Sequence, residues 1–412
     1  MSTHHTTAIV IGAGPAGLAT SRCLTAHGVD HVVLERGQLA QSWRSERWDS
    51  LRLLTPSWMN RLPGDDAPTD PDGFLTAGEL VARLDRYSQK IAPPILEHTT
   101  VNALRRSPTG FTIDTDHGRW SCRAAVIATG ASSRPNLPAL ASAMPPRVHR
   151  LHSVHYRNPD DVGYGGVLVV GASSSGVQIA DELRSAGREV TIAVGDHVRL
   201  ARTYRDRDIY WWMQAIGLLD ERHDNVPDFA RARRLPSAQL IGTPERRALD
   251  LATLDKAGVT IVGRLVGITT SQAQFSGSLQ NHVTSADLKL GRLLDRIDRH
   301  VTEHAMTQLG PIDRPEPLRL PPAPTAIPLD RFETVVWATG LRPDDSWIDP
   351  ALRDRRGQIT HDGGIGDVPG LYVIGRPVTR RRSSGFIAGI ASDAVELTGH
   401  LRQQLDRRST AA

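Results

Sequence analysis

The sequence predicts an α/β protein made of two Rossmann-like dinucleotide-binding domains, with the second domain inserted into the first. A pattern of strand, glycine turn and helix occurs twice, and each copy is followed by a strand that ends in Ala-Thr-Gly. The 412 residues exceed the length of one ordinary domain, which is about 100–200 residues. Hydrophobic residues make up 39% of the chain and charged residues 23%, as in globular proteins.

The first copy begins with the short apolar strand TAIVI at 7–11, followed by the turn GAGPAG at 12–17 and an Ala-rich helical stretch. In such a turn the first glycine permits a tight bend, the second lets a pyrophosphate approach the backbone, and the third lets helix and strand pack closely. The helix that follows presents free N–H groups and its positive dipole end. The cofactor-binding residues expected here are Gly12, Gly14, Pro15, Ala16 and Gly17.

The next strand, HVVLE, ends in Glu35, which lies 23 residues after Gly12. A carboxylate at this place accepts hydrogen bonds from both ribose hydroxyls of an adenosine and would repel a 2′-phosphate. The first unit therefore suits FAD or NAD. Further cofactor-binding residues expected in this unit are Arg36, Trp43, Thr129, Gly130 and, at the tip of the later strand GLYVIGR, Gly375.

The second copy runs over 166–194 and has the turn GASSSG, in which Ser173 replaces the middle glycine. Val194 stands where Glu35 stands in the first copy, so the strand end carries no carboxylate. Arg199 and Arg202 follow and could hold a 2′-phosphate, which favours NADPH, whereas Asp196 could serve the ribose of NAD. A solvated loop is the alternative for both arginines. The nucleotide-binding residues expected here are Gly171, Ser173, Ser174, Ser175, Gly176, Arg199 and Arg202. Thr339 and Gly340, in the second Ala-Thr-Gly, are further expected cofactor-binding residues.

Composition and charge exclude several classes of protein. The net charge of +4 is spread along the chain and does not form the basic stripe that nucleic acid requires. Two distant cysteines exclude a disulfide framework, a Cys-rich zinc site and a CxxC redox pair, so any redox chemistry needs a cofactor, and no metal is expected. No apolar run reaches the length of about 20 residues that spans a membrane. We therefore expect a soluble, cytoplasmic protein.

The two turns, the two Ala-Thr-Gly strands, the linker LHSVHYRNP at 151–159 and the stretch WDSLRLLTPSWMNRLPG at 48–64 resemble the class B flavin-dependent monooxygenases, in particular the flavin-containing monooxygenase and YUCCA-like branch. The resemblance implies an FAD domain, an NADP domain and reduction of FAD by NADPH. It also implies that O₂ adds to the flavin as a 4a-hydroperoxide, which oxygenates a small organic substrate. The implied partners are that substrate and O₂, and a homodimer is compatible with this picture.

The resemblance also suggests catalytic residues. The family fingerprint Phe-x-Gly-x-x-x-His-x-x-x-aromatic is matched at its end by His152 and Tyr156, but Pro146 and Val148 stand at the Phe and Gly positions. In the family this histidine helps to organise the complex of reduced flavin and NADP. The insertion at 43–60 is expected near the flavin face, and packing alone is the alternative for each side chain. The catalytic candidates are His152, Thr55, Trp58 and Asn60.

The incomplete fingerprint keeps two other functions open. One is an NAD(P)H oxidase or electron-transfer flavoprotein that does not oxygenate a substrate, and the other is a non-catalytic nucleotide sensor. The expected organisation is an FAD domain at 1–160 and 330–412 with the NADP domain at 161–329, and the substrate in the cleft between them. The run Arg380–Arg382 could contact a phosphate or face solvent.

Overall fold

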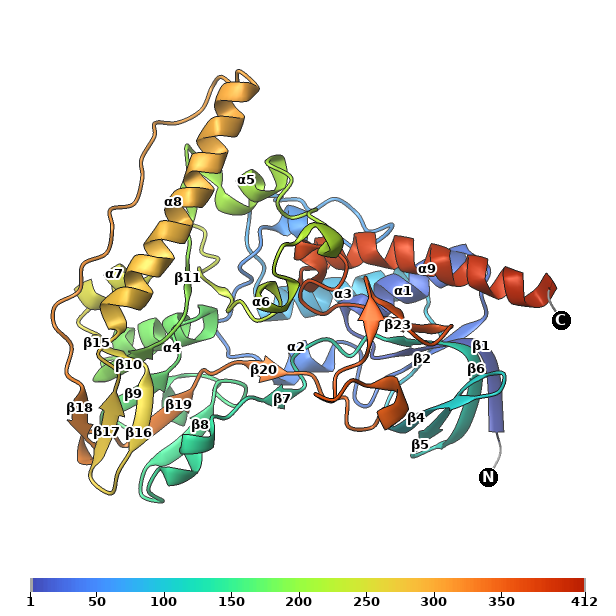
Figure 1. Cartoon of the computed structure of the whole chain (residues 1–412), viewed down its shortest axis with the longest axis horizontal. Coiled ribbons are helices and arrows are strands. Elements are labelled where there is room, and N and C mark those ends of the chain that lie inside the picture. Colours follow the sequence, from blue (N-terminus) through green and yellow to red (C-terminus); the bar gives the residue numbers. More distant parts are fainter. Residues whose placement is uncertain (1–2, 411–412) are drawn as a thin grey trace.

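The structure, a computed structural model, describes residues 3–410 of the chain. Two separate β-sheets with parallel strands, each flanked by helices, lie toward opposite ends of the long axis (Figure 1). Both expected Rossmann-like units are therefore present, and the predicted α/β class is confirmed.

The first sheet has a parallel centre in the order β23-β6-β1-β2-β3, so the carboxyl ends of these strands share one edge. These strands are β1 (Thr3–Ile11), β2 (His31–Leu34), β3 (Ile95–Leu96), β6 (Gly118–Ile127) and β23 (Leu371–Val373). Antiparallel strands extend the sheet: β4 (Val101–Ser107) and β5 (Gly110–Thr115) beside β6, and β22 (Ile365–Gly366) and β21 (His361–Asp362) beside β23. β1 begins before the expected strand because Thr3 to Thr6 also pair with β6.

Three helices form a common core with the first sheet: α1 (Pro15–Ala26), α3 (Ala77–Ile91) and α9 (Ile387–Thr410). α1 buries small residues such as Ala16, Gly17 and Ala19, so that the helix lies close to β1 and packs against α9. α3 begins with a capping box, in which the Thr76 side chain accepts a hydrogen bond from the backbone of Glu79 and the Glu79 carboxylate accepts one from the backbone of Thr76. These helices hold the glycine turn at the sheet edge.

The second sheet is entirely parallel, in the order β15-β10-β9-β19-β8. Its strands are β8 (His149–His152), β9 (Val167–Val170), β10 (Val190–Val194), β15 (Thr260–Gly263) and β19 (Thr334–Trp337). α4 (Ser174–Ser185) and α7 (Leu251–Lys256) share a core with one face, and the antiparallel strands β16 (Leu265–Ile268), β17 (Gln272–Phe275) and β18 (Ala326–Pro328) cover the other. Because both faces are covered, the central strands VLVV and TVVW are apolar throughout.

The strand pairing gives the inserted domain different limits from the expected 161–329. The second Ala-Thr-Gly strand, β19, was expected in the FAD domain, but it pairs with β9 and β8 of the second sheet. β8, which contains His152, also belongs to this sheet rather than to the segment 1–160. The chain crosses between the domains at β7 (Arg134–Pro135) and β20 (Leu341–Arg342), which pair with each other in antiparallel fashion.

The helix predicted from the apolar spacing at 286–301 is present as α8 (Leu279–Glu303), which rises away from the second sheet (Figure 1). Its buried residues Leu290, Leu294 and Ile297 pack with α5 (Ile209–Ala215). Among residues 3–410, no helix is both long and apolar enough to cross a membrane. The remaining short elements are α2 (Gln41–Ser45), α6 (Phe229–Ala232), β11 (Val198–Arg199), β12 (Thr203–Tyr204), β13 (Arg207–Asp208) and β14 (Ala238–Gln239).

Candidate dinucleotide sites

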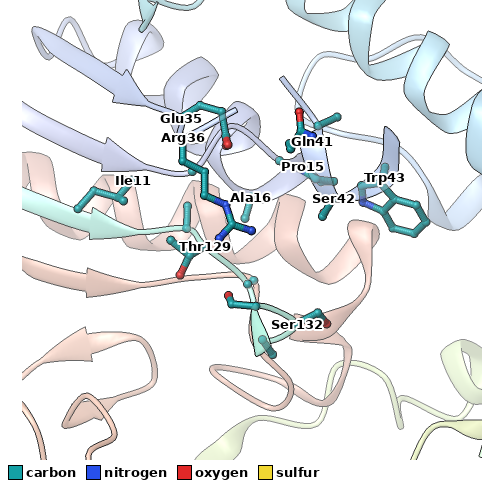
Figure 2. Close-up of a pocket in the computed structure, with 18 of the residues that line it drawn as sticks. Ile11, Pro15, Ala16, Glu35, Arg36, Gln41, Ser42, Trp43, Thr129 and Ser132 are labelled. Atoms are coloured by element: carbon teal, nitrogen blue, oxygen red, sulfur yellow. The ribbon is translucent and has the colours of Figure 1, made fainter. Parts of the chain in front are cut away.

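A cavity of about 370 Å³ opens at the carboxyl edge of the first sheet. It lies where the turn between β1 and α1, the segment after β2, α2 and the amino end of α9 meet. Figure 2 shows Glu35 and Arg36 on one side of it, Trp43 on another, and Thr129 and Ser132 opposite. The expected cofactor-binding residues that line it are Gly12, Gly14, Pro15, Ala16, Glu35, Arg36, Trp43, Thr129, Gly130 and Gly375.

The glycine turn at the cavity has the backbone that the sequence predicts. Gly12 has a φ of +106°, and a Cβ there would lie 2.8 Å from the carbonyl oxygen of Ala128. A Cβ on Gly17 would lie 1.8 Å from the carbonyl oxygen of Gly12, so this residue serves packing and does not line the cavity. Gly14 precedes the first residue of α1, and a Cβ there would meet nothing within 4 Å. The space beside Gly14 can therefore receive a ligand.

Glu35 is buried directly after β2, and its carboxylate faces the glycine turn. One oxygen accepts a hydrogen bond from the backbone of Ala13 at 2.8 Å, and the other accepts one from Gly37 at 3.0 Å. A carboxylate oxygen can accept more than one hydrogen bond, so both oxygens can still accept from ribose hydroxyls. Arg36 beside it forms a longer, exposed ion pair with Glu46 at 3.5 Å.

Two further observations show that the cavity fits a dinucleotide. The hydroxyl oxygen of Thr129 is buried at the cavity wall without a hydrogen-bond partner, although buried hydroxyls are normally paired. The amino end of α1 has no side-chain cap and no acidic residue in its first turn, so its N–H groups and positive dipole end are available to a phosphate. The residues present therefore fit FAD.

Arg47 also lines the cavity, and the sequence analysis did not select it. Its guanidinium lies 4.8 Å from the ring centre of Trp43 and donates a hydrogen bond to the backbone carbonyl of Glu46. Among the described residues, no carboxylate lies within ion-pair distance of Arg47. Burial lowers the pKa of Arg47, the charge of Glu46 raises it and that of Arg157 lowers it further. An unpaired cation at a cavity wall can bind an anion.

Other wall residues come from segments that the sequence analysis left unassigned. Asp344 and Trp347 follow β20, and Ile387 and Ile390 belong to the amino end of α9. They carry no motif of their own. The one signal that could have identified them is their place after the second crossing between the domains.

The turn of the second unit repeats the backbone of the first. Gly171 has a φ of +108°, and a Cβ on Gly176 would lie 1.9 Å from the carbonyl oxygen of Gly171. Ser173 precedes α4 with φ −82° and ψ −174°, close to the φ −82° and ψ −170° of Gly14, and its side chain does not cap the helix. Ser174 accepts a hydrogen bond from Gln178, and Ser175 is half-buried in the first turn of α4. The amino end of α4 is thus uncapped by side chains, as that of α1 is.

Arg199 and Arg202 do not match the role expected of them. Arg199 is buried and pairs with Asp250 at 2.9 Å and Asp287 at 2.6 Å. Arg202 is 2% exposed, and its guanidinium pairs with Asp208 and donates to the backbone carbonyl of Leu54. Because carboxylates within the protein already pair with both cations, neither guanidinium is placed to bind a 2′-phosphate.

The insertion residues Thr55 and Asn60 bind each other. The Thr55 hydroxyl donates to the Asn60 side-chain oxygen at 2.8 Å, and the Asn60 amide donates to the backbone carbonyls of Thr55 and Pro56. Neither side chain, nor that of Trp58, lines this cavity. The indole N–H of Trp58 is buried without a partner. Thr55 and Asn60 therefore stabilise the loop through their mutual hydrogen bonds, and the indole N–H of Trp58 remains without an acceptor.

His152 lies at the end of β8, outside the cavity lining. Its Nε2 lies 3.2 Å from the carbonyl oxygen of Gly340, and its Nδ1 accepts a hydrogen bond from the backbone of Val154. Burial lowers the pKa of His152, so the ring is neutral and donates through Nε2. Thr339 in turn donates to the carbonyl of Asn136 at 2.6 Å. His152, Thr339 and Gly340 therefore join the second sheet to the connections between the domains.

The arginines of the run after Gly375 are buried or partly buried, and each pairs with a carboxylate. Arg381 is buried against Asp393, Arg380 pairs with Glu396 at 2.5 Å, and Arg382 pairs with Glu221. Arg376, which follows Gly375, forms a buried two-bond ion pair with Asp345. Within residues 3–410, no group of three or more His, Cys, Asp or Glu side chains is arranged to hold a metal.

Comparison with known proteins places the chain in a family. The family model described as pyridine nucleotide-disulphide oxidoreductase matches residues 9–214. The chain is 30% identical to the oxidoreductase CzcO-like of Geobacillus kaustophilus, over 95% of this chain and 97% of that protein. It is 30% identical to indole-3-pyruvate monooxygenase YUCCA4 of Oryza sativa subsp. japonica, over 47% of this chain and 48% of that protein. The chain belongs to the pyridine nucleotide-disulphide oxidoreductase family, and its similarity to the YUCCA monooxygenases over about half its length supports the expected class B resemblance.

Solved structures share the fold of this chain. A flavin-containing monooxygenase from Stenotrophomonas maltophilia is 21% identical, with a TM-score of 0.66 over 98% of this chain and 99% of that one. OTEMO in complex with FAD and NADP is 14% identical, with a TM-score of 0.57 over 98% of this chain and 86% of that one. These structures show the shared fold, and the family match with the full-length relative shows that the protein is an oxidoreductase.

Proposed function

We propose that the protein is an FAD-containing, NADPH-dependent monooxygenase that transfers one oxygen atom of O₂ to a small organic substrate. The observation that carries this proposal is the cavity at the edge of the first sheet. It combines an uncapped helix end, a buried carboxylate after the second strand and the unpaired hydroxyl of Thr129. These are the groups that the pyrophosphate and ribose of FAD require.

The residues of the chain bind, orient and shield the cofactor. Glu35 accepts from the ribose hydroxyls, the amino end of α1 binds the pyrophosphate, and the Thr129 hydroxyl donates to the ligand. FAD, when bound, supplies the redox chemistry by accepting a hydride from the nicotinamide and passing electrons to O₂. The second unit presents the amino end of α4 to the nicotinamide nucleotide.

A 2-oxo acid is the substrate class to test first. The relative YUCCA4 is named for indole-3-pyruvate, which is a 2-oxo acid. Arg47 at the cavity wall has no carboxylate partner among the described residues and can pair with a substrate carboxylate. Sulfides, amines and ketones complete the screen, because family members oxygenate soft nucleophiles and carbonyl groups.

The first part of the test measures FAD binding. We expect the purified protein to be yellow, and Glu35→Ala to bind FAD about 10- to 100-fold more weakly, because a charge-assisted hydrogen bond contributes about 1.5–3 kcal/mol. Glu46→Ala is the matched control, since this carboxylate also lines the cavity but pairs with exposed Arg36. A colourless wild type that stays colourless with excess FAD would contradict the proposal.

The second part measures oxygen transfer. With NADPH, ¹⁸O₂ and each substrate class, we expect substrate-dependent NADPH consumption and one labelled oxygen atom in the product. NADPH consumption that reduces O₂ without labelling any product would identify an oxidase instead. If the protein oxidises NADPH no faster than free flavin does, the result would favour a non-catalytic nucleotide sensor.

A further inference from the structure

The pairing register of the strands shows which residue of the second unit corresponds to Glu35 of the first. In the first sheet Ile11, directly before Gly12, pairs with Leu34, and Glu35 follows. In the second sheet Val170, directly before Gly171, pairs with Ala193, and buried Val194 follows. The end of β10 thus has no carboxylate at the position of Glu35, and the residue after Val194 is Gly195.

Arg264 occupies the space that a side chain at Gly195 would fill. β15 pairs in parallel with β10, and the last residues of the two strands, Gly263 and Val194, lie opposite each other. Arg264 directly follows β15 and Gly195 directly follows β10, so both lie at the same edge of the sheet. A Cβ on Gly195 would lie 3.0 Å from Nε of Arg264 and 3.2 Å from its terminal nitrogen. The neighbouring strand therefore supplies a guanidinium at a position where β10 itself has no side chain.

Asp196 and His282 complete a cluster with Arg264. The Arg264 guanidinium donates to one carboxylate oxygen of Asp196 at 3.0 Å, and Nδ1 of His282 lies 3.0 Å from the other. His282 comes from the first turns of α8, whose amino end lies beside β15 and β10 (Figure 1). Although partial burial raises the pKa of Asp196, the charges of His282 and Arg264 outweigh it and hold that pKa below its usual value.

Unlike Arg199 and Arg202, this cluster is open to a ligand. The Arg264 side chain is 53% exposed and that of Asp196 is 71% exposed, whereas the Arg202 side chain is 1% exposed. A phosphate has three acceptor oxygens, so one incoming phosphate group could accept hydrogen bonds from both Arg264 and His282 in place of Asp196.

We propose that Arg264 and His282 bind the 2′-phosphate of NADPH, and that this phosphate replaces the Asp196 carboxylate as their partner. The inference rests on the proposed nicotinamide site in the second unit. Arg264 and His282 are then specificity-determining residues: they distinguish NADPH from NADH and take no part in the redox step. Asp196 keeps the two donors together in the free protein and opposes phosphate binding through its charge.

The test compares two fragments of the nucleotide on the FAD-loaded protein, 2′,5′-ADP and 5′-ADP, by isothermal titration calorimetry. We expect the wild type to bind 2′,5′-ADP at least 10-fold more tightly. Arg264→Ala should remove most of that preference and change the affinity for 5′-ADP less than about twofold. Asp196→Asn should strengthen binding of 2′,5′-ADP alone, because it removes a competing negative charge and keeps the size of the side chain.

Arg331→Ala is the matched control. This arginine is 61% exposed and pairs with Glu189 near the amino ends of the strands of the same sheet, away from the nucleotide edge. Equal binding of the two ADPs by the wild type, or an equal loss of both in Arg264→Ala, would overturn the proposal, as would a preference that Arg264→Ala leaves intact. Because no turnover is measured, a preference for 2′,5′-ADP would stand even if the labelled-oxygen experiment identified an oxidase.

Discussion

His361 is a partly buried imidazole next to several cations. Its Nε2 lies 2.8 Å from a guanidinium nitrogen of Arg233 and accepts its N–H. Burial, followed by the charges of Arg233, Arg376 and His223, lowers the pKa of His361 to about 4. The ring is therefore a neutral acceptor in the folded protein near neutral pH.

This low pKa predicts a pH dependence of stability. An unfolded histidine has a pKa of about 6.5, so between about pH 6.5 and pH 4 the unfolded chain takes up a proton that the folded chain does not. The free energy of unfolding should therefore decrease as the pH is lowered through this window, and the loss should reach roughly 2–3 kcal/mol at its lower end. Above about pH 6.5, His361 makes no contribution to the pH dependence of the free energy of unfolding.

Urea unfolding at pH 7.5 and pH 5 measures this effect, with His361→Gln as the comparison because Gln keeps an acceptor for Arg233. We expect the variant to lose less stability than the wild type on acidification, since other titrating groups are common to both. The same pH dependence in the two proteins would show that His361 does not titrate in this way.

At the scale of single residues, the sequence predicted the lining of the cavity better than the partners of the arginines in the second unit. GAGPAG and Glu35 are local signals, because the spacing of the glycines and of the strand end fixes which residues meet at the sheet edge. The role of Arg199 could not be predicted, because its partners Asp250 and Asp287 lie 51 and 88 residues further along the chain. Thr55 and Asn60 likewise appear free in the sequence, although they bind each other.

At the scale of elements, strand identity was predicted better than strand pairing. β6 and β19 are each followed by Ala-Thr-Gly, and each lies between two parallel neighbours in its sheet. Sequence similarity could not show that β19 pairs with β9 and β8 rather than with β23. Pairing depends on contacts between distant segments, and the apolar pattern of a buried strand suits either sheet equally well.

The amino end of α9 depends on a buried ion pair. Arg381 donates to Asp393 at 2.7 Å, and the Asp393 side chain is fully buried. Burial raises the pKa of Asp393, and Arg381 opposes this rise. Asp393 lies in the second turn of α9, one turn after Ile390, which lines the cavity with Ile387. The pair therefore ties this end of α9 to the segment that precedes it.

We expect Arg381→Met to lower the free energy of unfolding by about 3–5 kcal/mol, because it leaves a buried carboxylate without its partner. It should also weaken FAD binding, since the wall formed by α9 loosens. The double variant Arg381→Met with Asp393→Asn should recover part of the stability. Lys90→Ala, which breaks an exposed pair with Asp66, is the control and should cost less than about 1 kcal/mol. A loss as small as that of the control would show that the Arg381–Asp393 pair does not support the helix end.

At the scale of the whole molecule, the two domains are joined by more than the crossing strands β7 and β20. Residues 219–223 of the segment between β10 and β15 pair through their backbone with residues 380–383, which precede α9. The amide of Arg382 donates to the carbonyl of Glu221, and that of Ser383 donates to the carbonyl of Leu219, each at 3.0 Å. The Arg382 side chain also pairs with the Glu221 carboxylate.

This contact predicts where the domains first separate. Arg382→Ala should speed amide hydrogen exchange at 219–223 and 380–383 by about 2- to 5-fold, because a partly exposed ion pair contributes up to about 1 kcal/mol to local opening. Exchange in the central strands β9 and β10 should not change, since their opening needs disruption of the second core. Arg331→Ala, which removes an equal charge from the second domain away from this contact, should leave both segments as they are. Faster exchange throughout the second domain would instead show that Arg382 stabilises the domain itself, and unchanged exchange at both segments would show that the backbone pairing alone holds the domains together there.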